Sequence, residues 1–193
     1  QWGLRAINMF VGWEITTGKS DTIVAVVDSG IDSVHDELQN RLWVSDDTVN
    51  GADDDGNGFI DDVNGYNFVE HNTSIVDDYG HGTFVAGIIG ATALNEQAIA
   101  GINWYARLMS VKVVDANGSG YVSYMAQGVH YAAINGADVI APVAAGRPSH
   151  THPRHPPAAG SHDGRLRDSR DVPCDGAGLR RGRDCGRSMR FRT

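Results

Sequence analysis

The stretch TIVAVVDSGID, residues 22–32, begins with a short β-branched run that is apolar after its first residue and leads directly into Asp28. Runs of this kind are typical of strands that are buried on both faces of a parallel sheet, so we predict a strand over residues 22–27. A second run, LMSVKVV at residues 108–114, predicts another such strand and is followed by the loop-forming sequence DANGSG. Asp28 therefore stands at the carboxyl end of a predicted strand.

The segment YVSYMAQGVHYAAINGADVI, residues 121–140, predicts a helix and then a further strand. Val122, Met125 and Val129 recur near the helical period, and the pattern favours a helix of about 15 residues that ends at Asn135 and Gly136. Residues 137–140 then predict a strand. The alternation of strand, helix and strand predicts an α/β fold with a doubly wound parallel sheet, in which ligands bind beyond the carboxyl ends of the strands.

Charge divides the 193-residue chain into two unlike parts, although its formal net charge is −8. Residues 1–146 contain 19 acidic and 5 basic side chains, whereas residues 147–193 contain 5 acidic and 11 basic ones, all arginine. The second part is rich in Gly, Pro and His and has few apolar residues, so we expect a tail over residues 141–193 that is disordered. An alternative is that this tail is the translation of a GC-rich gene out of frame.

The tail offers two further interpretations, both of which the pattern disfavours. Its arginines lack the interleaved aromatic residues and the helical period that would indicate binding to nucleic acid, so no nucleic-acid partner is expected. A zinc site is the second interpretation, but the spacings match no usual pair of ligands. The residues concerned are His150, His152, His155, His162, Cys174 and Cys185. No apolar run approaches the roughly 18 residues of a membrane helix, so no membrane partner is expected either.

Residues 45–78 form a long acidic segment in which only YNFV, residues 66–69, is typical of a strand. Within it, DDDGNGFIDD at residues 53–62 matches positions 1, 3, 5, 6, 7 and 9 of an EF-hand-like calcium loop. The matching residues are Asp53, Asp55, Asn57, Gly58, Phe59 through its carbonyl, and Asp61. Position 12 is Asn64 instead of glutamate, and Asp62 is the substitute. We predict a calcium site, with a solvated acidic loop as the alternative.

One histidine, His81, stands between two glycines at the start of GHGTFVAG, residues 80–87. Asp28 ends a strand and His81 begins a predicted helix, so the two side chains are expected to meet in adjacent loops above one edge of the sheet. An imidazole that is oriented by a buried carboxylate through Nδ1 keeps Nε2 free as a general base near neutral pH. The alternative is that Asp28 only caps its strand and that His81 is structural.

These motifs resemble those of the subtilisin-like serine peptidases: VAVVDSGID around Asp28, and GHGTFVAG around His81 with Phe84 where histidine or cysteine is commoner. Supporting matches are QWGLRAIN and WEITTG near the start, AGIN at residues 100–103, LMSVKVVDANGSG at 108–120 and GADVI at 136–140. The resemblance covers residues 1–140 in order and implies the amino-terminal half of the peptidase domain, with the parallel α/β fold. It implies Asp28 and His81 as catalytic residues, and Gly118, Ser119 and Gly120 as the edge that pairs with a peptide substrate.

The resemblance further implies a secreted, calcium-stabilised serine endopeptidase that acts on proteins or peptides, with an inhibitory propeptide that this chain lacks. It ends after GADVI, where the chain continues as APVAAGRPSH and contains no serine in the Gly-Thr-Ser-Met-Ala context of the family nucleophile. Ser188 in GRSM lacks the expected continuation. We therefore predict a chain that is truncated before the nucleophile and inactive as given. A non-catalytic calcium-binding module is the alternative function.

Overall fold

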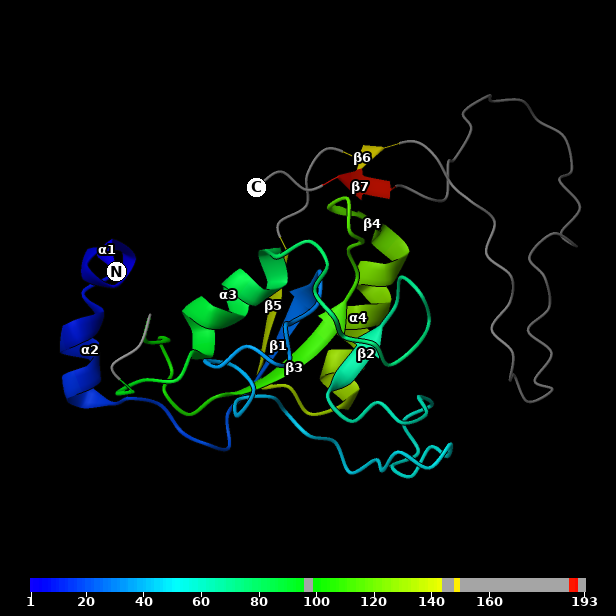
Figure 1. Ribbon diagram of the computed structural model, residues 1–193, viewed down its shortest axis with the longest axis horizontal. Helices are drawn as coiled ribbons and strands as arrows, with labels where there is room; N and C mark the ends of the chain where they lie inside the picture. The colour runs from blue at the N-terminus through cyan, green and yellow to red at the C-terminus, as the bar shows by residue number, and fades with distance from the viewer. Residues whose placement is uncertain (96–98, 144–147, 150–187, 191–193) are drawn as a thin grey trace, which may run out of the picture.

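The computed structural model describes residues 1–95, 99–143, 148–149 and 188–190 (Figure 1). The predicted disorder over residues 141–193 falls almost entirely outside the described residues. The histidines and cysteines of the zinc interpretation lie outside them altogether.

Four parallel strands form the central sheet, and their order is β2-β3-β1-β5. They are β1 (Ile23–Asp28), β2 (Gly65–Asn67), β3 (Arg107–Lys112) and β5 (Val139–Pro142). The two central strands, β1 and β3, are buried almost throughout, which explains their continuous apolar runs. Their register pairs Asp28 with Lys112, so both side chains stand at the carboxyl end of the sheet.

Helices cover both faces of this sheet, as Figure 1 shows for α3 (His81–Gly90) and α4 (Val122–Ile134). Val24, Val26 and Leu108 pack in one core cluster with Ala86 of α3. Alternate residues of the same strands, including Val27 and Val111, pack in a second cluster with Tyr131 of α4. Because successive side chains of a strand point to opposite faces, the two clusters lie on opposite sides of the sheet. This arrangement confirms the predicted doubly wound α/β fold.

Two short helices, α1 (Trp2–Ala6) and α2 (Met9–Ile15), precede the sheet. Trp13 of α2 packs edge-on against Trp104, with ring centroids 5.2 Å apart, and its Nε1 donates a hydrogen bond to the Ile102 carbonyl. The start of the chain is thereby attached to the segment that leads into β3. Among the described residues, no helix combines the length and the apolar character needed to cross a membrane.

A second, small sheet contains the strands β4 (Ser119–Tyr121), β6 (Pro148–Ser149) and β7 (Ser188–Arg190), and β7 pairs antiparallel with both of the others. The sequence predicts a loop over residues 115–120, but the structure has the strand begin at Ser119. The Asp115 carboxylate explains the difference, because it accepts hydrogen bonds from the backbone N–H groups of Asn117 and Ser119 and holds the turn that leads into β4.

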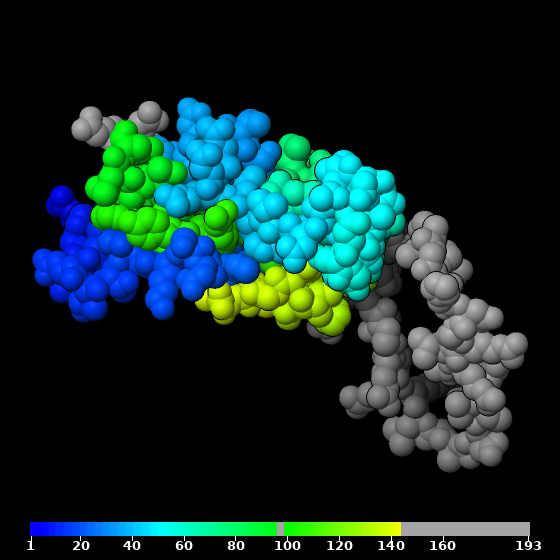
Figure 2. Space-filling model, turned by 90° about the horizontal axis from the view of Figure 1, so that it is seen from below, coloured from blue at the N-terminus to red at the C-terminus, as the bar shows by residue number. Residues whose placement is uncertain are grey.

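The acidic segment lies beside the carboxyl-terminal end of α4. In Figure 2 the cyan part of the chain, which contains residues 53–62, forms a protrusion next to the yellow-green part. Asn57 Nδ2 donates to Asn135 Oδ1 at 3.0 Å, and the Tyr131 hydroxyl donates to Asp62 Oδ2. The Phe59 ring completes the attachment by packing edge-on against Tyr131 with centroids 4.9 Å apart.

Candidate functional site

Asp28 and His81 meet at the carboxyl end of the sheet, as the sequence predicts. Asp28 is the last residue of β1 and His81 is the first residue of α3, so each side chain is held by the end of a packed element. The distance from His81 Nδ1 to Asp28 Oδ2 is 2.8 Å. The Asp28 side chain is 2% exposed whereas that of His81 is 29% exposed, so only the imidazole faces solvent.

The hydrogen bond selects one form of the imidazole. The Asp28 carboxylate can only accept, and its other oxygen already accepts from the Ser29 backbone N–H at 2.7 Å. In the neutral imidazole, Nδ1 therefore carries the proton that is donated to Asp28, and the lone pair is on Nε2. Chemically, this arrangement suits a general base that takes a proton from a neighbouring hydroxyl group.

The glycines beside His81 serve the approach of α3 to the sheet. Gly80 has φ +94°, a left-handed conformation that L residues with a side chain rarely adopt, and it immediately precedes the helix. Gly82 is buried, and a Cβ at this position would lie 2.1 Å from the Gly30 carbonyl oxygen. Phe84, by contrast, is exposed on the outer side of the helix.

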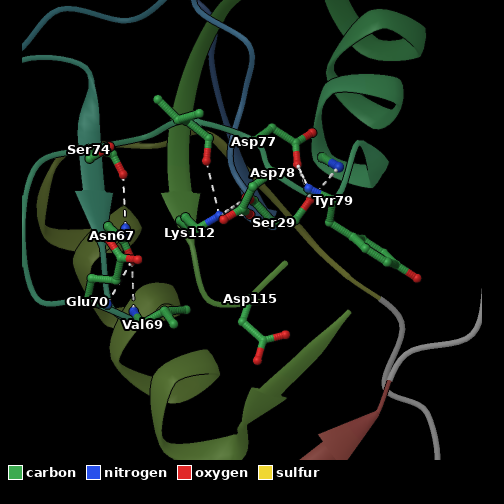
Figure 3. Close-up of polar contacts among 12 residues, drawn as sticks. Ser29, Asn67, Val69, Glu70, Ser74, Asp77, Asp78, Tyr79, Lys112 and Asp115 are labelled. Atoms are coloured by element: carbon green, nitrogen blue, oxygen red, sulfur yellow. Dashed lines mark hydrogen bonds and ion pairs between the residues drawn. The ribbon is translucent and has the colours of Figure 1, made fainter. Parts of the chain in front are cut away.

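A polar network that the sequence analysis missed surrounds this pair. Asp77 accepts hydrogen bonds from Ser29 and Thr83, and Lys112 donates to the carbonyl oxygens of Ser29 and Val76. Figure 3 shows Ser29, Asp77, Asp78 and Lys112 gathered between the end of β3 and the start of α3. The signal available in the sequence is weak, because Asp77 and Asp78 look like ordinary loop residues in DDYGHG. Only the fold brings Ser29 and Lys112 to them.

The predicted substrate edge begins at Gly118 and continues through Ser119 and Gly120 in β4. Gly118 has φ +70°, and a Cβ there would lie 2.6 Å from the ring of Tyr79, which is two residues before His81. The edge is thus packed against the segment that leads into the histidine. β4 pairs antiparallel with β7, with Gly120 opposite Met189, so its backbone accepts an added strand.

Three carboxylates of the acidic segment converge closely enough to hold a metal ion. They belong to Asp47, Asp53 and Asp55, whose nearest oxygens all lie within 4.8 Å of one another. Asp47 stands six residues before the predicted loop and was not anticipated. Two buried oxygens of this region, Asp47 Oδ2 and Asp62 Oδ1, have no hydrogen-bond donor among the described residues. Burying a carboxylate oxygen without a hydrogen-bond donor is costly. The carboxylate oxygens of this region therefore fit the ligand set of a bound cation.

The carboxyl groups of this cluster differ in their pKa shifts. Burial raises the pKa of Asp47, but hydrogen bonds from Asp55, Asp62 and Asp54 outweigh it and lower the pKa. Burial and, to a smaller extent, the nearby Asp47 carboxylate raise the pKa of Asp62 to about 6, although hydrogen bonds from Tyr131 and Asn57 lower it. Burial also raises the pKa of Asp55, and the charges of Asp47 and Asp53 add to that effect. Mutual repulsion of this kind is relieved by a divalent cation.

The remaining predicted ligands have other contacts. The Asp61 carboxylate accepts from the backbone N–H groups of Asn50 and Gly51, at 2.9 Å each. Asn57 Nδ2 donates to Asp55 Oδ2 and Asp62 Oδ2, while its Oδ1 accepts from the Phe59 N–H. Asn64, at position 12 of the loop, donates to the Trp43 carbonyl at 2.7 Å.

Comparisons with known proteins agree with this geometry. Residues 19–165 match the model of the subtilase family. The chain is 40% identical over 121 residues to a cell wall-associated protease of Bacillus subtilis, a match that covers 63% of this chain and 12% of that protein. It is 34% identical over 140 residues to thermitase of Thermoactinomyces vulgaris, covering 72% of this chain and 43% of thermitase. A minor extracellular protease of Bacillus subtilis is 35% identical over 140 residues, or 72% of this chain and 18% of that protein. The chain thus spans less than half the length of each of these relatives.

Proposed function

The chain belongs to the subtilase family, and on this premise we propose that it supplies two catalytic residues of a serine endopeptidase, with Asp28 orienting His81 as the general base. The observation that carries the proposal is the 2.8 Å hydrogen bond between a buried Asp28 oxygen and Nδ1 of the partly exposed His81. In the proposed reaction, His81 Nε2 removes the proton from a serine hydroxyl as the hydroxyl oxygen attacks the peptide carbonyl. Nε2 then gives the proton to the leaving amine.

The proposed reaction needs a serine nucleophile, and the printed sequence does not supply one. No serine in the printed chain stands in the Gly-Thr-Ser-Met-Ala context of the family. We propose that the printed chain, which has no serine in this context, does not hydrolyse peptides. Without the nucleophile, the Asp28–His81 pair has no hydroxyl group to activate, so covalent catalysis is lost.

The proposed substrates are proteins or peptides bound in an extended conformation. Gly118, Ser119 and Gly120 would supply the backbone groups that pair with the substrate, as in other strand-addition complexes. The pairing of β4 with Ser188–Arg190 supports this assignment, because this edge already accepts an antiparallel strand. A propeptide that inhibits the enzyme, and secretion from the cell, belong to the same proposal. One of the relatives carries the name of an extracellular protease.

We also propose that the acidic segment binds Ca²⁺ through the carboxylates of Asp47, Asp53, Asp55 and Asp62. The convergence of three of these carboxylates and the buried oxygens without donors support it. The Phe59 carbonyl and the Asn57 amide complete the proposed ligand set. The ion would neutralise the cluster and hold the segment against α4, which is a structural role. Asp61, predicted as a ligand from the loop pattern, is instead engaged with Asn50 and Gly51.

The peptidase proposal is tested by comparing two proteins. The first is the printed 193-residue chain, for which no hydrolysis of a casein substrate is expected. The second continues past residue 140 with the carboxyl-terminal part of a subtilase domain, and it is expected to hydrolyse casein and to be inactivated by a serine-directed phosphonate. His81→Ala in the second protein should reduce kcat by about 10⁴-fold or more. Asp21→Asn, an exposed change at the amino end of β1, is the matched control.

Two outcomes would contradict the peptidase proposal. One is hydrolysis by the printed chain that survives His81→Ala. The other is an active longer protein whose kcat is unchanged by His81→Ala. Either result would mean that the Asp28–His81 pair is not the general base of the reaction.

A further inference from the structure

Asp77 is a half-buried residue beside the Asp28–His81 pair, and its carboxylate accepts several hydrogen bonds. Its Oδ1 accepts from the Ser29 hydroxyl at 2.8 Å and from the Gly80 N–H at 2.8 Å, with a longer contact of 3.2 Å from the Tyr79 N–H. Its Oδ2 accepts from both the backbone N–H and the hydroxyl of Thr83, at 2.8 and 2.6 Å. Five donors from two separate parts of the chain thus converge on one carboxylate.

Ser29 connects this carboxylate to β1. Its hydroxyl donates to Asp77 and at the same time accepts from the Gly82 N–H at 2.9 Å, while its backbone N–H donates to Asp28 Oδ1. Ser29 therefore contacts the catalytic aspartate through its backbone and the first turn of α3 through its side chain. Because Ser29 is fully buried, water does not compete for these bonds.

Lys112 supports the same segment from β3. Its side chain is 3% exposed, and its ammonium group donates to the Ser29 carbonyl at 2.7 Å, to the Val76 carbonyl at 3.0 Å and to the Asp78 carboxylate. A buried ammonium with three acceptors is a rigid anchor, since leaving it unpaired is costly. It fixes the backbone on both sides of the Ser29–Asp77 bond.

Ordinary helix capping does not account for this arrangement. A capping carboxylate satisfies the free N–H groups of the first helical turn, and the bonds from Gly80 and Thr83 to Asp77 do this. The bond from the Ser29 hydroxyl adds nothing to the cap. It joins the cap of α3 to the residue after Asp28, which is the connection that sets the distance between the two catalytic side chains.

We propose that Asp77 is a positioning residue that clamps the end of β1 to the start of α3 through Ser29 and Thr83, and so holds His81 Nδ1 against Asp28 Oδ2. The proposal rests on the proposed function, because positioning His81 matters for a general base. Its test observes only the hydrogen bond between His81 and Asp28 and needs no catalysis. Asp77 itself makes no contact with a substrate or with the reacting atoms.

The test observes the Nδ1 proton of His81 by NMR in the full 193-residue chain, where no turnover is needed. A ring N–H that donates to a buried carboxylate gives a downfield signal that exchanges slowly with water, and its loss in His81→Ala assigns it. In Asp77→Asn, an NH₂ group replaces one carboxylate oxygen and faces the hydrogen-bond donors that this oxygen had accepted from. The Nδ1 signal is therefore expected to disappear or to exchange rapidly. The far-UV circular dichroism should be retained, which shows that the variant is folded. Asp21→Asn is the control, because it removes one negative charge as well, here from an exposed side chain, and it should keep the signal.

Ser29→Ala provides a second test if Asp77→Asn does not fold, because it breaks the same bridge and leaves Asp77 bound to Thr83. The expected result is again loss of the slowly exchanging proton. A signal that persists unchanged in a folded Asp77→Asn or Ser29→Ala variant overturns the clamp and leaves the proposed peptidase function intact. Absence of the signal from the unmodified chain means that the pair is not formed in solution, which overturns the clamp and the proposed function together.

Discussion

At the scale of single residues, Gly82 lets the helix that carries His81 lie against the segment that carries Asp28. A Cβ at position 82 would lie 2.1 Å from the Gly30 carbonyl oxygen and 3.2 Å from the Asp28 Cβ. The first distance is far below van der Waals contact with a backbone atom, which has little freedom to move. The absence of a side chain at Gly82 is therefore a requirement of the Asp28–His81 geometry and not only of the turn.

Gly82→Ala is expected to destabilise the protein and to separate Asp28 from His81. The added methyl group must displace α3 from the end of β1, and overpacking of this kind typically costs about 1–3 kcal/mol. Urea unfolding followed by circular dichroism measures the loss. Gly3→Ala is the control, because a Cβ at this position of α1 has no atom within 4 Å. Equal stabilities of the two variants would contradict the prediction.

Asp77 gives the stability of the protein a dependence on pH. Burial raises the pKa of its carboxyl group, but hydrogen bonds from Thr83, Gly80 and Ser29 outweigh burial, and the folded-state pKa lies below the usual value of 3.8. A group of this kind binds fewer protons in the folded state, so it contributes stability above its unfolded pKa. This contribution is lost as the pH falls through the folded pKa.

Asp77→Asn is therefore expected to flatten the acid limb of the stability curve. Urea unfolding of the unmodified chain at pH 6, 4 and 3 should show a steeper loss of the free energy of unfolding below pH 4 than the variant shows. A variant that loses stability as steeply as the unmodified chain would mean that another carboxylate is responsible. Asp21→Asn serves as the control, since its side chain is exposed.

At the scale of elements, the acidic segment is a loop whose position depends on few apolar contacts and many carboxylates. Asp62 and Asn57 attach it to α4 through Tyr131 and Asn135. Its inner oxygens, on Asp47 and Asp62, have no donor among the residues that the structure describes. Such a segment is expected to stay ordered against α4 only when a cation balances its charge.

Calcium is expected to raise the melting temperature of the chain, and two matched variants identify the ligands. Ligand in hundredfold excess over its Kd stabilises the fold by about 2.7 kcal/mol, which corresponds to a shift of several degrees. Asp47→Asn should abolish most of this calcium-dependent shift, because it removes a converging oxygen. Asp61→Asn should lower the melting temperature in chelator, because Asp61 accepts hydrogen bonds from backbone N–H groups. It should preserve the shift, because the Asp61 carboxylate lies outside the converging group. The reverse pattern would favour the ligand set expected from the loop spacing.

The elements that sequence predicted well are those whose burial is continuous. β1 and β3 carry unbroken apolar runs and lie within one or two residues of the predicted ends, and α4 follows its helical period from Val122 to Ile134. The residue pattern alone predicted a loop where β4 forms, because a three-residue strand with two small residues has no distinctive pattern. Only the family resemblance indicated an edge at Gly118, Ser119 and Gly120. The formation of β4 depends on the Asp115 turn and on pairing with a distant segment.

The same distinction applies to the site. Asp28 and His81 were predictable because Asp28 ends a patterned strand and His81 begins a patterned helix at the same edge of the sheet. Asp47, Asp77 and Lys112 were not, because their partners are distant in sequence or follow no periodic spacing. Lys112 is an instructive case: within LMSVKVV it resembles an exposed residue of a strand, yet it is 2% exposed and donates to the carbonyl oxygens of Ser29 and Val76.

At the scale of the whole molecule, the central sheet and the first helices present apolar surface to solvent. Within the described part of the chain, β5 pairs only with β1, and its first residue, Val139, is 51% exposed. On α1 and α2, Trp2, Phe10 and Ile15 are 84%, 51% and 83% exposed. A strand edge with free N–H and C=O groups beside exposed apolar side chains is a template for pairing with another copy.

The chain alone is therefore expected to self-associate at concentrations on the order of μM to mM, the range in which exposed edges promote aggregation. Sedimentation velocity across a dilution series should give a weight-average mass that rises with concentration above the 20.7 kDa of the monomer.

Val139→Lys places a charge on the open edge and should shift the association to higher concentration, because charged residues disfavour pairing between edges. Val49→Lys, which replaces a valine that is 82% exposed in the acidic segment away from the sheet, is the control. A monodisperse monomer across the whole series would show that the open edge of β5 is protected in solution. An equal effect of the two lysines would instead assign the association to net charge.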